Sequence, residues 1–109
     1  MSYKVATIAN FRKESKRLLK KFPSLKEELR ELGIELSANP NTGTPIGSNC
    51  YKIRISIASK GKGKSSGARI ITYVLVADST VYLLSIYDKS EQDDITDKEL
   101  EQLINFIKK

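Results

Sequence analysis

Histidine is absent from the sequence, and cysteine occurs only once, at Cys50. These two residue types supply the commonest general base and the usual transition-metal ligands, so any chemistry must rest on lysine, arginine, tyrosine or carboxylate groups. A lone cysteine cannot close an internal disulfide, which favours a reducing compartment. The sequence therefore predicts a cytoplasmic protein that uses no metal and no cofactor.

Long apolar runs are also missing. The longest, "IITYVLVA", has the length of a strand, and the opening stretch "MSYKVATIANFRKES" lacks the apolar segment of a secretory signal. With 109 residues, 39% of them hydrophobic and 29% charged, the composition is that of an ordinary globular protein. We expect one domain over residues 1–109 and no association with a membrane.

Acidic residues are missing from the middle of the chain. Residues 36–77 contain six Lys or Arg and no Asp or Glu, whereas residues 78–109 contain more acidic than basic side chains. The formal net charge of the whole chain is +6. A middle segment with unbalanced positive charge indicates a polyanionic partner, and nucleic acid is the commonest one in a cytoplasm.

Hydrophobic periodicity predicts the secondary structure. Strands are expected at residues 3–8, 51–57, 68–76 and 80–87, and helices at residues 10–22, 24–36 and 96–107. Residues 37–49 are rich in proline and glycine and are expected to form a loop. The order β-α-α-β-β-β-α predicts an α+β fold, in which an antiparallel sheet carries an N-terminal helical hairpin and a C-terminal helix.

Three sequence signals mark where these helices begin. Asn10 is expected to be the N-cap of the first helix. Ser24 with Glu27, and Thr96 with Glu99, have the spacing of capping boxes for the second and third helices.

Three cations are expected to share one face of the sheet. Lys52 and Arg54 alternate with core isoleucines, and Arg69 begins the next strand, where a hairpin can bring it across from them. We expect its side chain to face solvent. Like charges placed side by side repel, so the arrangement predicts a surface whose charge is balanced by a bound phosphate.

Other candidates have competing interpretations. Lys60, Lys62 and Lys64 either keep a hairpin loop soluble or contact RNA. Tyr87 ends a strand and either stacks on a base or is an ordinary aromatic at the edge of a sheet. Asp93, Asp94 and Asp97 are explained by the preference for acidic residues before and within the first turn of a helix and not as metal ligands.

Several segments together resemble a known family. "CYKIRI", "SSGARIITYV" and "VYLLSIYDKSEQDDIT" follow in order behind "FRKESKRLLKKFPSLKEEL". This set is similar to the RelE/ParE toxin superfamily of bacterial type II toxin–antitoxin systems, and is closest to its RelE- and HigB-like branch. The resemblance covers essentially the whole chain.

The resemblance implies a toxin that enters the ribosomal A site and cuts mRNA without a metal, and that a cognate antitoxin neutralises. In that interpretation the ribose 2′-hydroxyl attacks the adjacent phosphate. Lys52 is then a candidate general base, Arg54 helps to hold the phosphate and Arg69 clamps it as negative charge builds. Lys89 lies where the family often has an arginine that serves the leaving group.

The sequence departs from the family pattern in two respects. Lysine at position 89 cannot make the bidentate contact of an arginine, and the last helix has neither the tyrosine nor the histidine that some branches use. Two alternatives to an endoribonuclease therefore stay open. One is a ParE-like protein that inhibits DNA gyrase without catalysis, and the other is a small RNA-binding module that does not cleave.

Overall fold

The computed structural model describes residues 2–57, 67–92 and 94–108. Its elements are, in chain order, β1 (Lys4–Thr7), α1 (Ala9–Lys21), α2 (Leu25–Ala38), β2 (Thr44–Gly47), β3 (Cys50–Ile55), β4 (Ala68–Leu75), the short 3₁₀ turn η3 (Val76–Asp78), β5 (Thr80–Asp88) and α3 (Asp97–Lys108). The α+β class and the order of the expected elements are confirmed. Among the described residues, no helix has the length and apolar character needed to cross a membrane.

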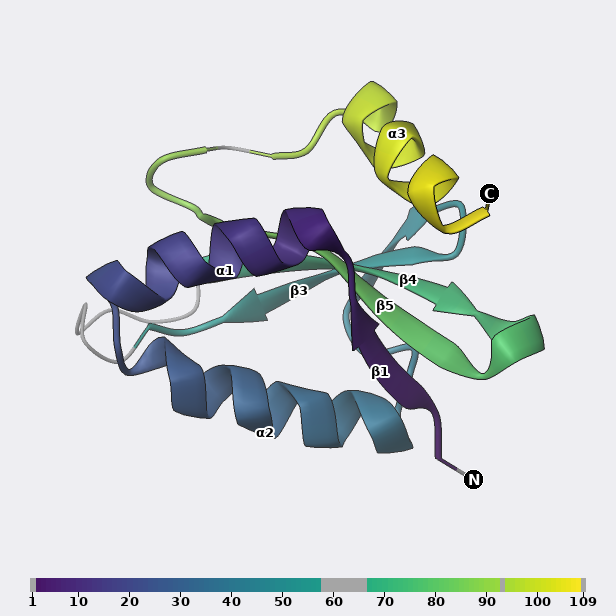
Figure 1. The fold of residues 1–109 in the computed structure, drawn as a ribbon, viewed down its shortest axis with the longest axis horizontal. Helices are drawn as coiled ribbons and strands as arrows, with labels where there is room; N and C mark the ends of the chain where they lie inside the picture. Colours follow the sequence, from purple (N-terminus) through teal and green to yellow (C-terminus); the bar gives the residue numbers. More distant parts are fainter. Residues whose placement is uncertain (1, 58–66, 93, 109) are drawn as a thin grey trace.

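The strands form one five-stranded sheet in the order β1-β5-β4-β3-β2. The chain from β2 to β5 is antiparallel throughout, whereas β1 lies parallel to β5 at the opposite edge. The sheet is therefore mixed, and it includes a short strand, β2, inside the segment that the sequence predicts to be a loop. Figure 1 shows α1 and α2 side by side across the sheet, with α3 standing apart from them.

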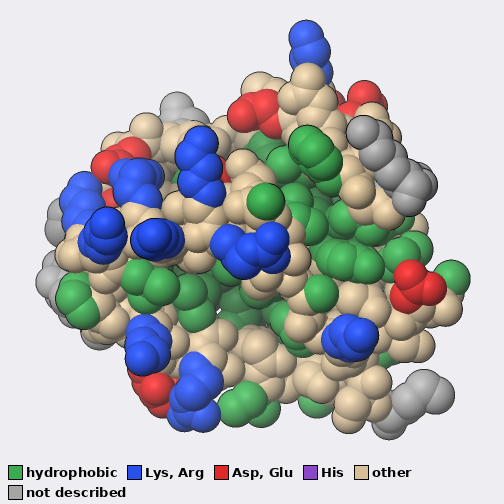
Figure 2. Space-filling model, viewed as in Figure 1, with side chains coloured by type: hydrophobic (Ala, Val, Ile, Leu, Met, Phe, Trp, Pro, Cys, Tyr) green, Lys and Arg blue, Asp and Glu red, His purple; other side chains and the backbone are tan. Residues whose placement is uncertain are grey.

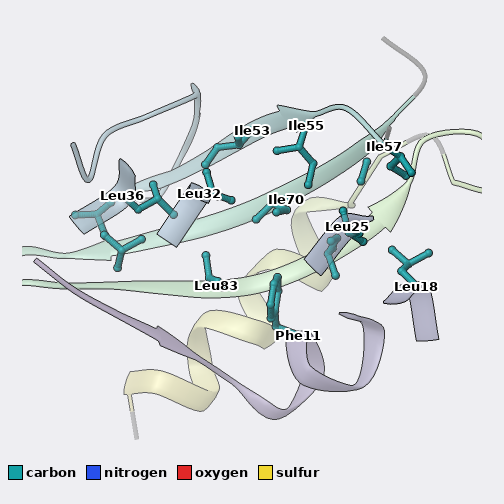
Figure 3. Packing of buried hydrophobic residues seen from close by; sticks show 14 residues of the cluster. Phe11, Leu18, Leu25, Leu32, Leu36, Ile53, Ile55, Ile57, Ile70 and Leu83 are labelled. Atoms are coloured by element: carbon teal, nitrogen blue, oxygen red, sulfur yellow. The ribbon is translucent and has the colours of Figure 1, made fainter. Parts of the chain in front are cut away.

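One face of the sheet packs against the helical hairpin. Phe11 and Leu18 of α1, and the leucines of α2, meet a layer of isoleucines from β3 and β4 (Figure 3). The expected stripe Ile53, Ile55 and Ile57 is part of this layer, with each residue no more than 8% exposed. Burial of apolar surface at about 25 cal/mol per Å² makes this layer the main source of stability.

The other face packs against α3. Ile70 belongs to the hairpin cluster and Ile71 to a second cluster that includes Leu100 and Ile104 of α3, because adjacent residues of a strand point to opposite faces. Leu103 and Ile107 pack against the same cluster, so the apolar positions of α3 share the side that faces the sheet. The face that carries Lys52 and Arg69 is thus the face that α3 partly covers.

The capping predictions have mixed outcomes. Thr96 and Glu99 form the expected box: the hydroxyl of Thr96 accepts from the N–H of Glu99 at 3.1 Å, and the Glu99 carboxylate accepts from the N–H of Thr96 at 3.1 Å. Ser24 precedes α2 but makes no side-chain cap, since its backbone is already helical (φ −62°, ψ −20°). Asn10 lies inside α1, where its amide donates to the carbonyl of Leu84 at 3.0 Å, so its prediction as an N-cap is wrong.

Candidate anion-binding site

The strand register aligns the candidate residues in a row across the sheet. Arg54 of β3 lies opposite Arg69 of β4, and Arg69 lies opposite Tyr87 of β5. Lys52 is two residues before Arg54, so it points to the same face. The structure thus brings three cations and one phenol together, as the alternation in the sequence predicts for the cations.

Lys52 has a counter-ion from a distant part of the chain. Its ammonium Nζ lies 3.3 Å from Oδ2 of Asp94, in the connection between β5 and α3. The side chain of Lys52 is 27% exposed and that of Asp94 is 57% exposed, so the pair stabilises the fold by at most about 1 kcal/mol. Residues 36–77 contain no acid of their own, but the acidic segment 78–109 supplies Asp94 as the counter-ion of Lys52.

Tyr87 completes the contacts of Asp94. Its hydroxyl donates to Oδ1 of Asp94 at 3.2 Å, and the backbone N–H of Ile95 donates to the same oxygen at 2.8 Å. Burial, the charge of Asp94 and the hydrogen bond to it raise the pKa of Tyr87 to about 12, against the opposing effect of the Arg69 charge. Tyr87 is therefore a neutral phenol and a hydrogen-bond donor over the physiological pH range.

The carboxylate of Asp94 is held in its charged form. Partial burial raises its pKa, but the N–H of Ile95, the ammonium of Lys52 and the hydroxyl of Tyr87 outweigh that effect and bring the pKa below its ordinary value. The residues around Asp94 thus form an arrangement that stabilises a negative charge.

The surroundings of Tyr87 and Arg69 differ from those expected. The residue Tyr87 is 2% exposed, so its ring offers no open face for a base to stack on. Arg69 is 4% exposed, and its guanidinium Nη1 donates to the carbonyl of Ala68 at 3.2 Å. The expectation of a solvent-facing Arg69 is wrong, because its side chain is buried on β4, the central strand of the sheet.

The backbone of Lys89 is fixed beside this row. Its N–H donates to the carbonyl of Gly67 at 3.0 Å, one residue beyond the last pair of β4 and β5. Gly67 passes so close to β3 that an added Cβ would overlap the carbonyl oxygen of Ile55. A glycine is needed there to bring Lys89 and Arg69 next to the end of β3. Lys60, Lys62 and Lys64 lie outside the described residues.

The connection between β5 and α3, which carries Asp94, is also held near its β5 end. Glu91 forms ion pairs with Arg17 at 3.2 Å and with Lys21 at 3.1 Å, both on α1. Asp88 accepts hydrogen bonds from the N–H and the hydroxyl of Ser90, which shapes the turn after β5. Figure 1 shows this connection arching over α1 on its way to α3.

A second basic surface lies on α1. Figure 2 shows Lys and Arg side chains gathered over this helix, which has six of them and one Glu in its sequence, "ANFRKESKRLLKK". The helix is exposed along this side, and a basic helix face suits a polyanion, although α1 packs on the face of the sheet opposite to Lys52 and Arg69.

The chemistry that this site supports is the binding of an anion by nitrogen and phenol donors. Among the residues that the structure describes, no group of three or more Cys, Asp or Glu side chains could hold a metal ion. Asp94 is the functional candidate that sequence reasoning missed. The signal was the surplus of acid in residues 78–109, but the sequence does not tell which of those acids reaches the sheet.

The fold and the site define a small basic α+β protein in which cations and a phenol are aligned across a five-stranded sheet. The chain belongs to the RelE toxin family, the toxins of RelE/RelB toxin–antitoxin systems, whose model matches residues 13–109.

Solved structures share this fold. A mutant of the Escherichia coli toxin RelE in the free state is 20% identical, with a TM-score of 0.66 over 98% of this chain and 99% of that one. The toxin in the intact E. coli RelBE complex is 21% identical, with a TM-score of 0.61 over 80% of this chain and 96% of that one. A chain of a Mycobacterium tuberculosis RelBE toxin–antitoxin complex is 18% identical, with a TM-score of 0.60 over 81% of this chain and 99% of that one.

Proposed function

We propose that this chain is a ribosome-dependent, metal-independent mRNA endonuclease that arrests translation in the cytoplasm. The observation that carries the proposal is the row formed by Arg54, Arg69 and Tyr87, with Lys52 beside it, in a chain without histidine. A protein that acted only by contact with another protein would have no need to align cations in this way.

The reaction requires stabilisation of charge on a phosphate while a 2′-hydroxyl attacks it. Arg69 is suited to that task, because a guanidinium can meet two phosphate oxygens with parallel hydrogen bonds. It is 4% exposed, so it reaches a phosphate only after its surroundings rearrange. Arg54 is exposed at the end of the row and can make the first contact.

The roles of the two lysines follow from their contacts. An ammonium ion paired with a carboxylate has no lone pair to accept a proton, so the Lys52–Asp94 contact supports an electrostatic role for Lys52 ahead of a role as general base. Lys89 is half-buried beside the start of β4, where it can donate to a leaving group. The exposed cations of α1, and Lys60, Lys62 and Lys64, are candidates for contact with ribosomal RNA.

A cognate antitoxin is the expected protein partner. The similar E. coli and M. tuberculosis proteins are described in toxin–antitoxin complexes. For this chain we propose that an antitoxin covers the row of cations or displaces α3, whose apolar residues pack against the sheet.

Induction of the protein in bacteria tests the function. We expect translation to stop and mRNAs to be cut within codons. Replacement of Arg69 by Ala should lower the cleavage rate by about 10²- to 10³-fold, the usual loss for one preorganised donor, and Arg69→Lys should recover only part of it. Melting temperature and cleavage should be measured on the same preparations, since Arg69 is buried.

The outcomes separate the three functions. Growth arrest with intact mRNA and a DNA-damage response would establish the gyrase inhibitor, and RNA binding without cleavage or arrest would establish the binding module. A folded Arg69→Ala variant that cleaves at the wild-type rate would show that the active site lies elsewhere.

A further inference from the structure

Three hydrogen-bond donors from three parts of the fold converge on one carboxylate. Lys52 comes from β3, Tyr87 from β5, and the N–H of Ile95 from the connection to α3. They contact both oxygens of Asp94, at 3.3, 3.2 and 2.8 Å respectively. An ammonium, a phenol and a backbone amide are also a suitable set of donors for two oxygens of a phosphate.

The nearby acids have other partners. Glu91 is held by Arg17 and Lys21 of α1, and Asp88 accepts from Ser90. Asp94 alone among these three contacts Lys52, so its position is not explained by a general excess of acid in the connection.

We propose that Asp94 is a built-in substitute for an RNA phosphate, which occupies the anion site of Lys52, Tyr87 and the Ile95 N–H until a phosphodiester displaces it. The inference rests on the proposed function in one respect, namely that the ligand of the site is an RNA phosphate. Asp94 is then a positioning residue. It keeps Lys52 and Tyr87 in place in the free protein and must leave before they can contact substrate.

Displacement requires little rearrangement. The Asp94 side chain is 57% exposed, so it can rotate into water, and the N–H of the next residue stays behind as a donor. Its departure removes the hydrogen-bond partner of Tyr87, which lies opposite the buried Arg69. Loss of that contact gives Tyr87 freedom to move, and this offers a route by which Arg69 becomes accessible.

The tethered Asp94 carboxylate also determines which anions can displace it and bind at the site. A group held on the same chain competes at an effective concentration on the order of millimolar. A single inorganic phosphate therefore has to overcome an internal competitor. An RNA strand gains a further contact with exposed Arg54 of the same row, and so it can displace Asp94 where a small anion cannot.

The test compares Asp94→Asn with Glu101→Gln. Both changes remove one negative charge, but Glu101 is an exposed residue on α3 outside the donor set. The probe is a fluorescent single-stranded RNA heptamer with 2′-O-methyl groups, which cannot be cleaved by attack of a 2′-hydroxyl. Anisotropy should give a Kd about fivefold lower for Asp94→Asn than for the wild type, because a competitor is lost. Glu101→Gln should stay within about twofold of the wild type.

Competition with inorganic phosphate gives a second measurement. Phosphate should displace the heptamer from Asp94→Asn at a concentration several-fold lower than from the wild type. Absorbance titration of the tyrosines, with Tyr87→Phe as the subtraction, should also show a lower pKa for Tyr87 once Asp94 is neutral. Asp94→Ser serves as the second variant if Asp94→Asn has a lowered melting temperature.

The result that overturns the inference is a folded Asp94→Asn or Asp94→Ser protein that binds the heptamer no more tightly than Glu101→Gln. If the Asp94 variants bind more tightly while no form cleaves mRNA, the inference holds and the proposed endonuclease activity fails. If the wild type cleaves but the Asp94 variants gain no affinity, the inference fails alone.

Discussion

Tyr87 is the residue on which burial, charge and hydrogen bonding act together. It is 2% exposed, lies opposite Arg69, and donates to Asp94 at 3.2 Å. These features matter to the row of cations, because Tyr87 is its last member, on β5. The hydroxyl of Tyr87 joins this strand to Asp94.

The raised pKa of Tyr87 has a consequence for stability at alkaline pH. Its pKa is about 12 in the folded protein, against about 10 in the unfolded chain. The folded state therefore holds the proton more tightly, so this contribution is fully present below pH 10 and is lost as the pH rises through 12. Relative to Tyr87→Phe, the free energy of unfolding should fall by about 2 kcal/mol between pH 9 and pH 11.5.

Urea unfolding at pH 9, 10, 11 and 11.5 measures this difference. Lysine titration is common to both proteins and cancels in the comparison. Equal pH dependence of the wild type and Tyr87→Phe would mean that burial and the contact with Asp94 do not raise the pKa of Tyr87.

At the residue scale, the sequence predicted which side chains share a face but not how they are covered. The two-residue period of a strand is a local property, and it was enough to align Lys52, Arg54 and Arg69. The exposure of Arg69 depends on what packs over it. The pairing of Lys52 with Asp94 joins positions 42 residues apart, and nothing local specifies it.

At the element scale, the three expected caps show when a sequence signal succeeds. Thr96 caps α3 through reciprocal hydrogen bonds with Glu99. Ser24 follows α1 so closely that its backbone is already helical. Asn10 and Glu14 are used instead to fasten α1 to β5, where Glu14 accepts from the hydroxyl of Ser85 at 2.8 Å.

Gly67 should tolerate no side chain, because β3 passes close to it. In Gly67→Ala the new methyl group would overlap the carbonyl oxygen of Ile55, and the backbone of β3 or β4 would have to shift. We expect the free energy of unfolding to fall by about 1 to 3 kcal/mol. Binding of the RNA heptamer should weaken as well, since Arg69 and Lys89 move with this backbone.

Gly33→Ala is the matched control. Gly33 lies within α2, and an added Cβ there meets nothing within 4 Å. This change should stabilise the protein by about 0.5 to 1 kcal/mol and leave RNA binding unchanged. Thermal unfolding of both variants measures the two changes in stability. A Gly67→Ala protein as stable as the wild type would contradict the close approach of Gly67 to the carbonyl oxygen of Ile55.

At the scale of the whole molecule, the two proposed partners, RNA and an antitoxin, would use different features of the surface. The cations of β3, β4 and α1 suit a polyanion, whereas α3 is held by an apolar stripe that another helix could replace. Two features of the sheet were not predicted at this scale. β2 is a four-residue strand within a proline- and glycine-rich segment, and the parallel pairing of β1 depends on a partner more than 70 residues away.

Co-expression tests the partner. With a small reading frame adjacent to its gene, this chain should purify as a stable complex and lose its toxicity. Hydrogen exchange should show either new protection on β3 and β4 or a loss of protection in α3, according to which surface the antitoxin takes. Abundant expression of the chain alone without growth arrest would count against the whole system.

The parallel pairing of β1 with β5 constrains the order in which a newly made chain can fold. Lys4 lies opposite Thr80, so the first strand has no partner in the sheet until most of the chain has been synthesised. The hairpins β3–β4 and β4–β5 connect neighbours in sequence and can form by themselves. Completion of the sheet therefore falls late in the synthesis of the chain, and until then the edge of β5 that β1 covers stays open.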